Sequence, residues 1–219
     1  MPPIDPEQFV RLVKPLLERN DLPGLLEFLK SNWTKEQITS LLPSPHTDAR
    51  KVAALCLALV GCRACIPDLV PHLKDADAMV NQMAEHALWS IWFRGSENEE
   101  ANHQLCRGTQ AMNRRELDHA VRHFERAIAL DPGFAEAYNQ RAIVRYLEEK
   151  YDASINDCLA TVEHMPCHFG AWAGLGSCYA HEGRVEDAVE AYERALEINP
   201  HMEGVRQLLE SLRGRRRRN

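Results

Sequence analysis

The stretch AWAGLGSCYAHEGRVEDAVEAYERALEINP, residues 171–200, decides the fold of this chain. It ends at Pro200, and Pro132 and Pro166 precede that proline at intervals of 34 residues (166 − 132 and 200 − 166). Small and apolar residues between these prolines recur with the same spacing. A fixed period in this range indicates stacked helical hairpins, because a single unit cannot bury its apolar face alone.

Each hairpin needs small residues where its two helices approach each other. Gly108, Ala142 and Gly176 supply them in the first helices, again 34 residues apart (142 − 108 and 176 − 142). Proline ends each second helix, because it cannot continue the hydrogen-bond ladder and it restrains the residue before it. We expect first helices near 97–112, 135–148 and 169–182, and second helices near 116–130, 151–163 and 185–198.

This pattern resembles the tetratricopeptide repeat, whose signature is W-x2-L-G-x2-Y, then A-x3-F, then P. The third unit matches it at Trp172, Leu175, Gly176, Tyr179, Ala188, Tyr192 and Pro200. The resemblance covers residues 96–199 and implies a protein-interaction scaffold whose first helices line a binding groove. The second unit departs from the signature at Cys158 and Thr161, which predicts looser packing there.

The first half of the chain resembles a region of HEAT repeats. A shift of 31 residues overlays Ala53 and Leu57 on Ala84 and Leu88 (84 − 53 and 88 − 57). An alanine-rich helix within 47–61 is followed by Ile66-Pro67-Asp68-Leu69, as in that family. The arginine usual early in a HEAT helix is Arg50 in one unit and Asn81 in the next.

We therefore predict an all-α chain that forms a right-handed α-solenoid. Its parts are a HEAT-like region over 1–95, three tetratricopeptide units over 96–200, and a capping helix with a basic tail over 201–219. Further helices are expected near 6–19, 22–31 and 34–42. Ser96 and Glu99 have the spacing of a capping box for the first hairpin. No Pro/Gly/Ser linker separates the halves, so we expect them to stack as one continuous superhelix.

Composition points to a soluble protein, with 45% hydrophobic and 26% charged residues. No run reaches the roughly 18 to 20 apolar residues that span a membrane, and charges interrupt residues 1–20 where a secretory signal would lie. A cytoplasmic location without membrane contact is therefore expected. The net charge of -6 does not indicate any class of partner. The seven cysteines are an odd number and cannot all pair with one another, so reduced thiols are expected.

Motifs for catalysis are missing, since the sequence has no G-x4-G-K-[ST], G-x-S-x-G or H-E-x-x-H. We expect neither enzymatic activity nor a cofactor. The main alternative is a metal- or thiol-dependent protein that uses Cys62 and Cys65, whose C-x2-C spacing suits zinc or redox chemistry. No second C-x2-C completes a zinc site, so structural packing is the more usual role. His164, Cys167 and His168 form a weaker metal candidate.

Three further alternatives concern surfaces. The arginine cluster at Arg213 and 215–218 suits nucleic acid or an acidic partner, although a solvated tail is the simpler interpretation and nucleic acid is not expected. Trp89, Trp92 and Phe93 share one helix face and form either core or a partner-binding patch. The third alternative is that the chain associates with copies of itself through the open edge of the helical stack.

The binding site is expected on the first helices of the three repeats, on a nearly uncharged face. Its side chains are Asn102, Leu105, Thr109, Asn113, Asn139, Gln140, Ile143, Tyr146, Ser177 and His181. Chaperone-binding relatives of this family place Lys, Asn and Arg at five clamp positions, which here are Leu105, Thr109, Gln140, Gly170 and Gly174. We therefore expect an extended peptide or an amphipathic helix as ligand, and not an acidic carboxyl-terminal tail.

Overall fold

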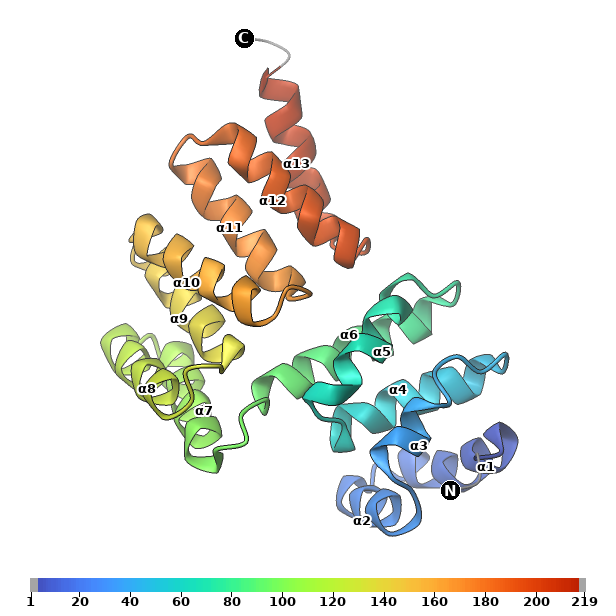
Figure 1. Cartoon of the computed structure of the whole chain (residues 1–219). Coiled ribbons are helices and arrows are strands. Elements are labelled where there is room, and N and C mark those ends of the chain that lie inside the picture. The colour runs from blue at the N-terminus through green and yellow to red at the C-terminus, as the bar shows by residue number, and fades with distance from the viewer. Residues whose placement is uncertain (1–3, 217–219) are drawn as a thin grey trace. The chain divides into compact units, whose positions relative to one another are not determined.

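A computed structural model describes residues 4–216, with side chains up to residue 214. All regular elements in that part of the chain are helical, which confirms the all-α prediction. The chain divides into two compact units, Met1–Trp92 and Phe93–Asn219, and each is described by itself. Figure 1 shows the order of their helices along the chain.

The first unit begins with helices whose starts are set by side-chain caps. Asp5 accepts a hydrogen bond from the backbone N–H of Gln8 at 3.2 Å, and Thr34 with Gln37 forms a capping box. The helices of this unit are α1 (Pro6–Glu18), α2 (Leu22–Asn32), α3 (Lys35–Thr39), α4 (Thr47–Val60), α5 (Ile66–Leu69) and α6 (Ala78–Phe93). Trp92 is buried and meets Trp89 edge to face, while Phe93 is exposed.

The segment after α4 is a broken helix. One α turn, α5, lies between two 3-10 segments, η1 (Arg63–Cys65) and η2 (Val70–Lys74). Pro67 and Pro71 cause the break, because each lacks the N–H that an α-helix would use. The second helix expected for a HEAT repeat is thus short, and the HEAT-like assignment stays a prediction.

The turn before α6 is stabilised by Arg50 and Asn81. The 31-residue shift places these two residues in the same register. Arg50 donates from Nε and Nη2 to the carboxylate of Asp75 at 2.8 and 2.9 Å. Asn81 donates to the carbonyl oxygen of Asp75 at 3.0 Å. The guanidinium of Arg50 lowers the pKa of Asp75 to about 2. The ion pair and the amide therefore fix this turn from both sides.

The second unit consists of three hairpins and a final helix. Their helices lie close to the predicted ranges: α7 (Glu99–Asn113) with α8 (Leu117–Leu130), α9 (Ala135–Leu147) with α10 (Tyr151–His164), α11 (Phe169–His181) with α12 (Val185–Ile198), and α13 (Glu203–Arg216). The capping box expected at Ser96 was wrong, because Asn98 caps α7. The Ser96 hydroxyl instead donates to Asp131 at 2.6 Å.

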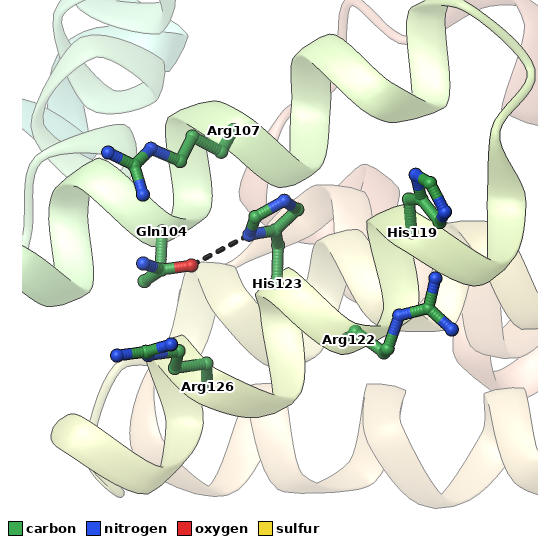
Figure 2. A pocket seen from close by; sticks show the side chains of 6 residues that line it. All are labelled: Gln104, Arg107, His119, Arg122, His123 and Arg126. Atoms are coloured by element: carbon green, nitrogen blue, oxygen red, sulfur yellow. Dashed lines mark hydrogen bonds between the residues drawn. The ribbon is translucent and has the colours of Figure 1, made fainter.

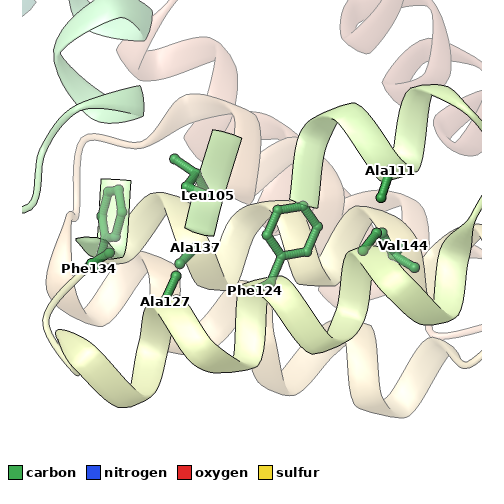
Figure 3. Close-up of a cluster of buried hydrophobic side chains, with 9 residues drawn as sticks. Leu105, Ala111, Phe124, Ala127, Phe134, Ala137 and Val144 are labelled. Carbon is green, nitrogen blue, oxygen red and sulfur yellow. The ribbon is translucent and has the colours of Figure 1, made fainter. Parts of the chain in front are cut away.

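Small residues stand where the helices of a hairpin approach most closely. A Cβ atom at Gly108 would collide with the ring of Phe124, and one at Gly176 would lie 2.5 Å from the ring of Tyr192. Phe124 is fully buried in the core of the first hairpin, which Figure 3 shows. Only glycine leaves room for these rings, so the 34-residue register corresponds to the packing.

The second hairpin replaces the large ring of its neighbours with small polar contacts. Cys158 occupies the position of Phe124 and Tyr192 and is buried. Ser154 donates to the carbonyl oxygen of Ala142 at 2.8 Å, and the thiol of Cys178 donates to Ser154 at 3.2 Å. The Ser154 hydroxyl thus bridges the backbone of α9 and a thiol of α11, where the other hairpins have aromatic bulk.

Helix α13 covers the apolar side of α12, as expected of a capping helix. Val205 and Leu209 are buried in a cluster with Tyr192 and Ala195. Arg213 forms an ion pair with Glu193 across the two helices. The Arg217 and Arg218 positions of the predicted basic tail lie outside the described residues, as do the side chains of Arg215 and Arg216.

Candidate functional site

The predicted groove residues come from α7, α9 and α11, and α9 contacts both of the other two helices. Seven of the ten side chains are exposed or partly exposed: Asn102, Thr109, Asn113, Ile143, Tyr146, Ser177 and His181. The other three are buried, which the spacing did not foresee. The solvent-accessible part of this predicted face is therefore smaller than the sequence suggested.

Leu105 is a core residue. Its side chain is 0% exposed and packs with Phe134 and Ala137 between α7 and α9, as Figure 3 shows. The prediction that it offers apolar contact to a ligand does not agree with this burial. The reason is that neighbouring first helices approach closely at this register, so a leucine there fills the gap between them.

Asn139 and Gln140 are also buried, and their amides bind a carboxylate of this chain. Both donate to Oε1 of Glu136, at 3.2 and 2.6 Å. Glu136 is itself buried, and its other oxygen lies 2.9 Å from Nε2 of His168. The amides expected to bind the backbone of a peptide thus satisfy a buried acid instead.

Two partly exposed members of the predicted set are held by local hydrogen bonds. Asn102 stabilises the turn before α7, because its side-chain amide donates to the carbonyl oxygen of Ser96 at 2.8 Å. Ser177 donates to Ala173 at 3.1 Å and lies 3.1 Å from the hydroxyl of Tyr192. These contacts fix the side chains in place and leave aromatic groups as the main feature of the face.

An aromatic cluster joins the ends of three helices. Tyr146 of α9 lies with its hydroxyl 2.9 Å from Nε2 of His181 of α11. The ring of Tyr151, the first residue of α10, stacks on His181 with centroids 4.6 Å apart and 15° between planes. Tyr146 meets the Tyr151 ring edge to face at 5.6 Å. The cluster is thus preorganised, with two rings and an imidazole on one surface.

Tyr151 was missed at the sequence level. The repeat register gave no signal for it, because the equivalent positions hold Leu117 and Val185, 34 residues away on either side (151 − 117 and 185 − 151). Burial, with Tyr151 and Cys178 nearby, raises the pKa of Tyr146. The phenol therefore stays neutral and serves as a hydrogen-bonding group at physiological pH.

A cleft of about 330 Å³ opens beside this cluster and shares His181 with it. Helices α11, α12 and α13 provide its lining residues, Ala180, His181, Tyr192, Leu208, Ser211 and Leu212. Leu208 is 48% exposed, so an apolar contact is available to a ligand. The sequence pattern predicts only a capping role for α13, because its apolar residues fit both a cap and a cleft wall.

The C-x2-C alternative finds no support in the surroundings of its thiols. Cys65 is buried, and burial raises its pKa, which opposes the thiolate that metal binding and redox attack require. All seven cysteines are free. Among residues 4–216, no three His, Cys, Asp or Glu side chains are grouped as a metal site needs.

Within the same part of the chain, none of the helices has the length and apolar character needed to cross a membrane.

Comparison with known proteins identifies the repeats of the second unit. Residues 107–163 and 170–202 match models of the tetratricopeptide repeat. A repeat-containing protein of Rhizobium etli is 34% identical over 101 residues, which cover 44% of this chain and 50% of that protein. Anaphase-promoting complex subunit 3 of Schizosaccharomyces pombe is 36% identical over 87 residues, or 40% of this chain and 13% of that subunit. The chain thus spans half or less of these relatives.

Solved structures show the same fold. The first repeat domain of Spaghetti, bound to the HSP90 peptide SRMEEVD, superposes with a TM-score of 0.53 at 19% identity, covering 54% of this chain and 94% of that one. The Sgt2 repeat domain of Aspergillus fumigatus gives 0.52 at 21% identity, covering 54% and 80%. Together with the sequence matches, these results confirm the expected repeat type.

Proposed function

Because residues 107–163 and 170–202 are tetratricopeptide repeats, we propose that the second unit is a scaffold that binds a peptide or protein element on its first helices α9 and α11 and on the adjoining parts of α10, α12 and α13. The observation that carries the proposal is the surface formed by Tyr146, Tyr151 and His181 next to the cleft at Leu208. Rigid aromatic groups beside an apolar cleft are the usual anchors of protein interfaces.

The ligand best suited to this surface has an apolar side chain for the cleft and a hydrogen-bonding group for His181. The Spaghetti domain was solved with an acidic HSP90 peptide. In this chain, however, the five clamp registers carry no Lys or Arg, and two of them, Leu105 and Gln140, are buried. An extended apolar segment or an amphipathic helix therefore fits this surface better than a carboxyl-terminal acidic tail.

The proposal includes a non-catalytic role and a cytoplasmic location. The support for the first is that burial raises the pKa of Cys56, Cys65, Cys158 and Cys178, so these thiols are poor nucleophiles. The support for the second is that seven free cysteines suit a reducing compartment.

The test is affinity capture with the full chain, followed by mass spectrometry and titration of the partner. Tyr146→Ala and Leu208→Lys should each weaken binding by about 1 to 3 kcal/mol, as for interface anchors. Leu147→Ala is the matched control, since Leu147 is 56% exposed on the same helix as Tyr146. Equal affinity of all variants would show that the binding site lies elsewhere on the chain. Competition by the peptide SRMEEVD would show that an acidic carboxyl-terminal tail is the ligand after all.

A further inference from the structure

At two positions of the hairpin, one on each helix, the three repeats have side chains of different chemical character. Both positions recur with the 34-residue period (141 − 107 and 157 − 123). From the first repeat to the third they hold Arg107 with His123, Arg141 with Asp157, and Leu175 with Ala191. The same place in the fold therefore accommodates either charge or apolar contact.

In the second repeat this place holds a buried carboxylate between two guanidinium groups. Arg141 donates to Asp157 from Nε and Nη2 at 2.9 and 2.7 Å, and Nη1 of Arg145 lies 2.8 Å from the same carboxylate. The Asp157 side chain is only 4% exposed. Paired and bidentate contacts of this kind are the arrangement in which arginine binds carboxylates most strongly.

The first repeat keeps one cation of this arrangement, Arg107, but has Ala111 in place of Arg145 and lacks the acid. A cleft of about 330 Å³ opens between α7 and α8, and Figure 2 shows its lining residues. They are Gln104, Arg107, His119, Arg122, His123 and Arg126. Arg107, Arg122 and Arg126 are exposed and make no ion pair within the described part of the chain. His123 stands where the second repeat has Asp157.

The floor of the cleft is rigid. Gln104 is 2% exposed, and its Oε1 lies 2.7 Å from Nδ1 of His123. Its Nε2 donates to Glu100 at 2.6 Å. Two carboxylates interact with these lining residues. Glu100 accepts from Gln104, and that hydrogen bond and the charges of Arg107 and Arg126 lower its pKa; Glu116 lies 3.8 Å from His119. Neither provides the two-point contact that Asp157 makes with Arg141.

The local field in this cleft is positive. Burial lowers the pKa of His123, and the charges of Arg107, His119, Arg122 and Arg126 lower it further. An anion in the cleft would act in the opposite direction and raise that pKa. The imidazole therefore provides a reporter for occupancy.

We propose that the cleft between α7 and α8 binds a short acidic segment of a partner protein, whose carboxylates pair with Arg107, Arg122 and Arg126. Arg122 and Arg126 are one helical turn apart, about 6 Å along α8. Alternate side chains of an extended segment are spaced by about 6.7 Å, so two successive acidic side chains on one face can each reach an arginine.

This site lies on different side chains from the aromatic surface proposed above and does not depend on it. The probe is a fluorescein-labelled hexaglutamate peptide, titrated by anisotropy against the full chain at low salt, with hexaglutamine as the uncharged comparison. Arg126→Gln should weaken binding about twofold to fivefold, the range for exposed ion pairs. Arg194→Gln is the matched control, because Arg194 occupies the equivalent position of the third repeat and its removal changes the net charge equally.

A second variant distinguishes binding in this cleft from nonspecific electrostatic attraction between the peptide and the protein surface. His123→Asp places a carboxylate beside Arg107, so it should abolish hexaglutamate binding through charge repulsion, while circular dichroism checks that the helices are retained. Tyr146→Ala should leave hexaglutamate binding unchanged. In the wild type, the pKa of His123 measured by NMR should rise when the peptide binds.

Three results would overturn the proposal. One is no binding of hexaglutamate by the wild type at low salt. Another is equal binding by wild type, Arg126→Gln and His123→Asp. The last is tighter binding of inorganic phosphate, with displacement of the peptide, which would assign the cleft to a phosphate ligand.

Discussion

The imidazole of His168 and the carboxylate of Glu136 meet inside the second unit with Nε2 and Oε2 2.9 Å apart and both side chains 0% exposed. Nδ1 of His168 accepts the backbone N–H of Ala171 at 3.0 Å, so the ring proton is on Nε2 and is donated to Glu136. The start of α11 is thus tied to α9 through a neutral histidine and a buried acid.

Removing this acid should destabilise the repeats strongly. Glu136→Ala leaves the donors of Asn139, Gln140 and His168 buried without their acceptor. We expect a loss of about 2 to 5 kcal/mol in the free energy of unfolding, measured by urea denaturation with circular dichroism. Glu190→Ala, at an exposed position of α12, is the control and should change stability by less than about 0.5 kcal/mol. Equal stability of both variants would contradict the buried network.

Adding a single methyl group at Gly176 should also destabilise the second unit. Its Cβ would lie 2.5 Å from the Tyr192 ring, so Gly176→Ala forces the hairpin apart at a cost of about 1 to 3 kcal/mol. Gly204→Ala meets no atom within 4 Å and is the matched substitution in α13. Thermal melting should show a lower midpoint for the first variant only. The same midpoint for both would mean that the 34-residue register is wrong.

Acid should weaken the first unit through Asp75. Its folded pKa of about 2 lies below the ordinary aspartate value of 3.8, because the hydrogen bonds from Arg50 stabilise the charged form. The stabilisation is therefore complete above about pH 4 and is lost as the pH falls from 4 towards 2. Urea titrations of wild type and Asp75→Asn should differ by about 1 to 2 kcal/mol at pH 7 and converge near pH 2. A constant difference across this range would exclude the ion pair as the cause.

Replacing both cysteines of the C-x2-C motif should have little effect. Cys65 is buried and Cys62 half-buried, and alanine fills most of the space of a thiol in a packed site. We expect Cys62→Ala/Cys65→Ala to keep the wild-type melting temperature within a few degrees and the same zinc content by elemental analysis. Stoichiometric zinc in the wild type that disappears in the double variant would revive the metal alternative.

The positions of the helices in the second unit could be predicted from the sequence alone. Proline spacing and the recurrence of Gly108, Ala142 and Gly176 set the hairpin period, and α8, α10 and α12 begin and end within one residue of the predicted ranges. This works because helix ends and close crossings depend on local backbone chemistry, namely a missing N–H or a missing Cβ. In the first unit the same proline rule, applied to Pro67 and Pro71, accounts for the break that the repeat pattern alone did not reveal.

Which side chains face a ligand was decided only by the tertiary structure. Register placed Leu105, Asn139 and Tyr146 on one predicted face, yet Leu105 joins the core, Asn139 binds Glu136, and only Tyr146 reaches the surface cluster. The deciding partners, such as His168 for Glu136 and His181 for Tyr146, lie 32 and 35 residues away. Periodicity fixes the direction of a side chain relative to its own helix, whereas burial and pairing depend on the distance and chemistry of a neighbouring helix, which no local pattern contains.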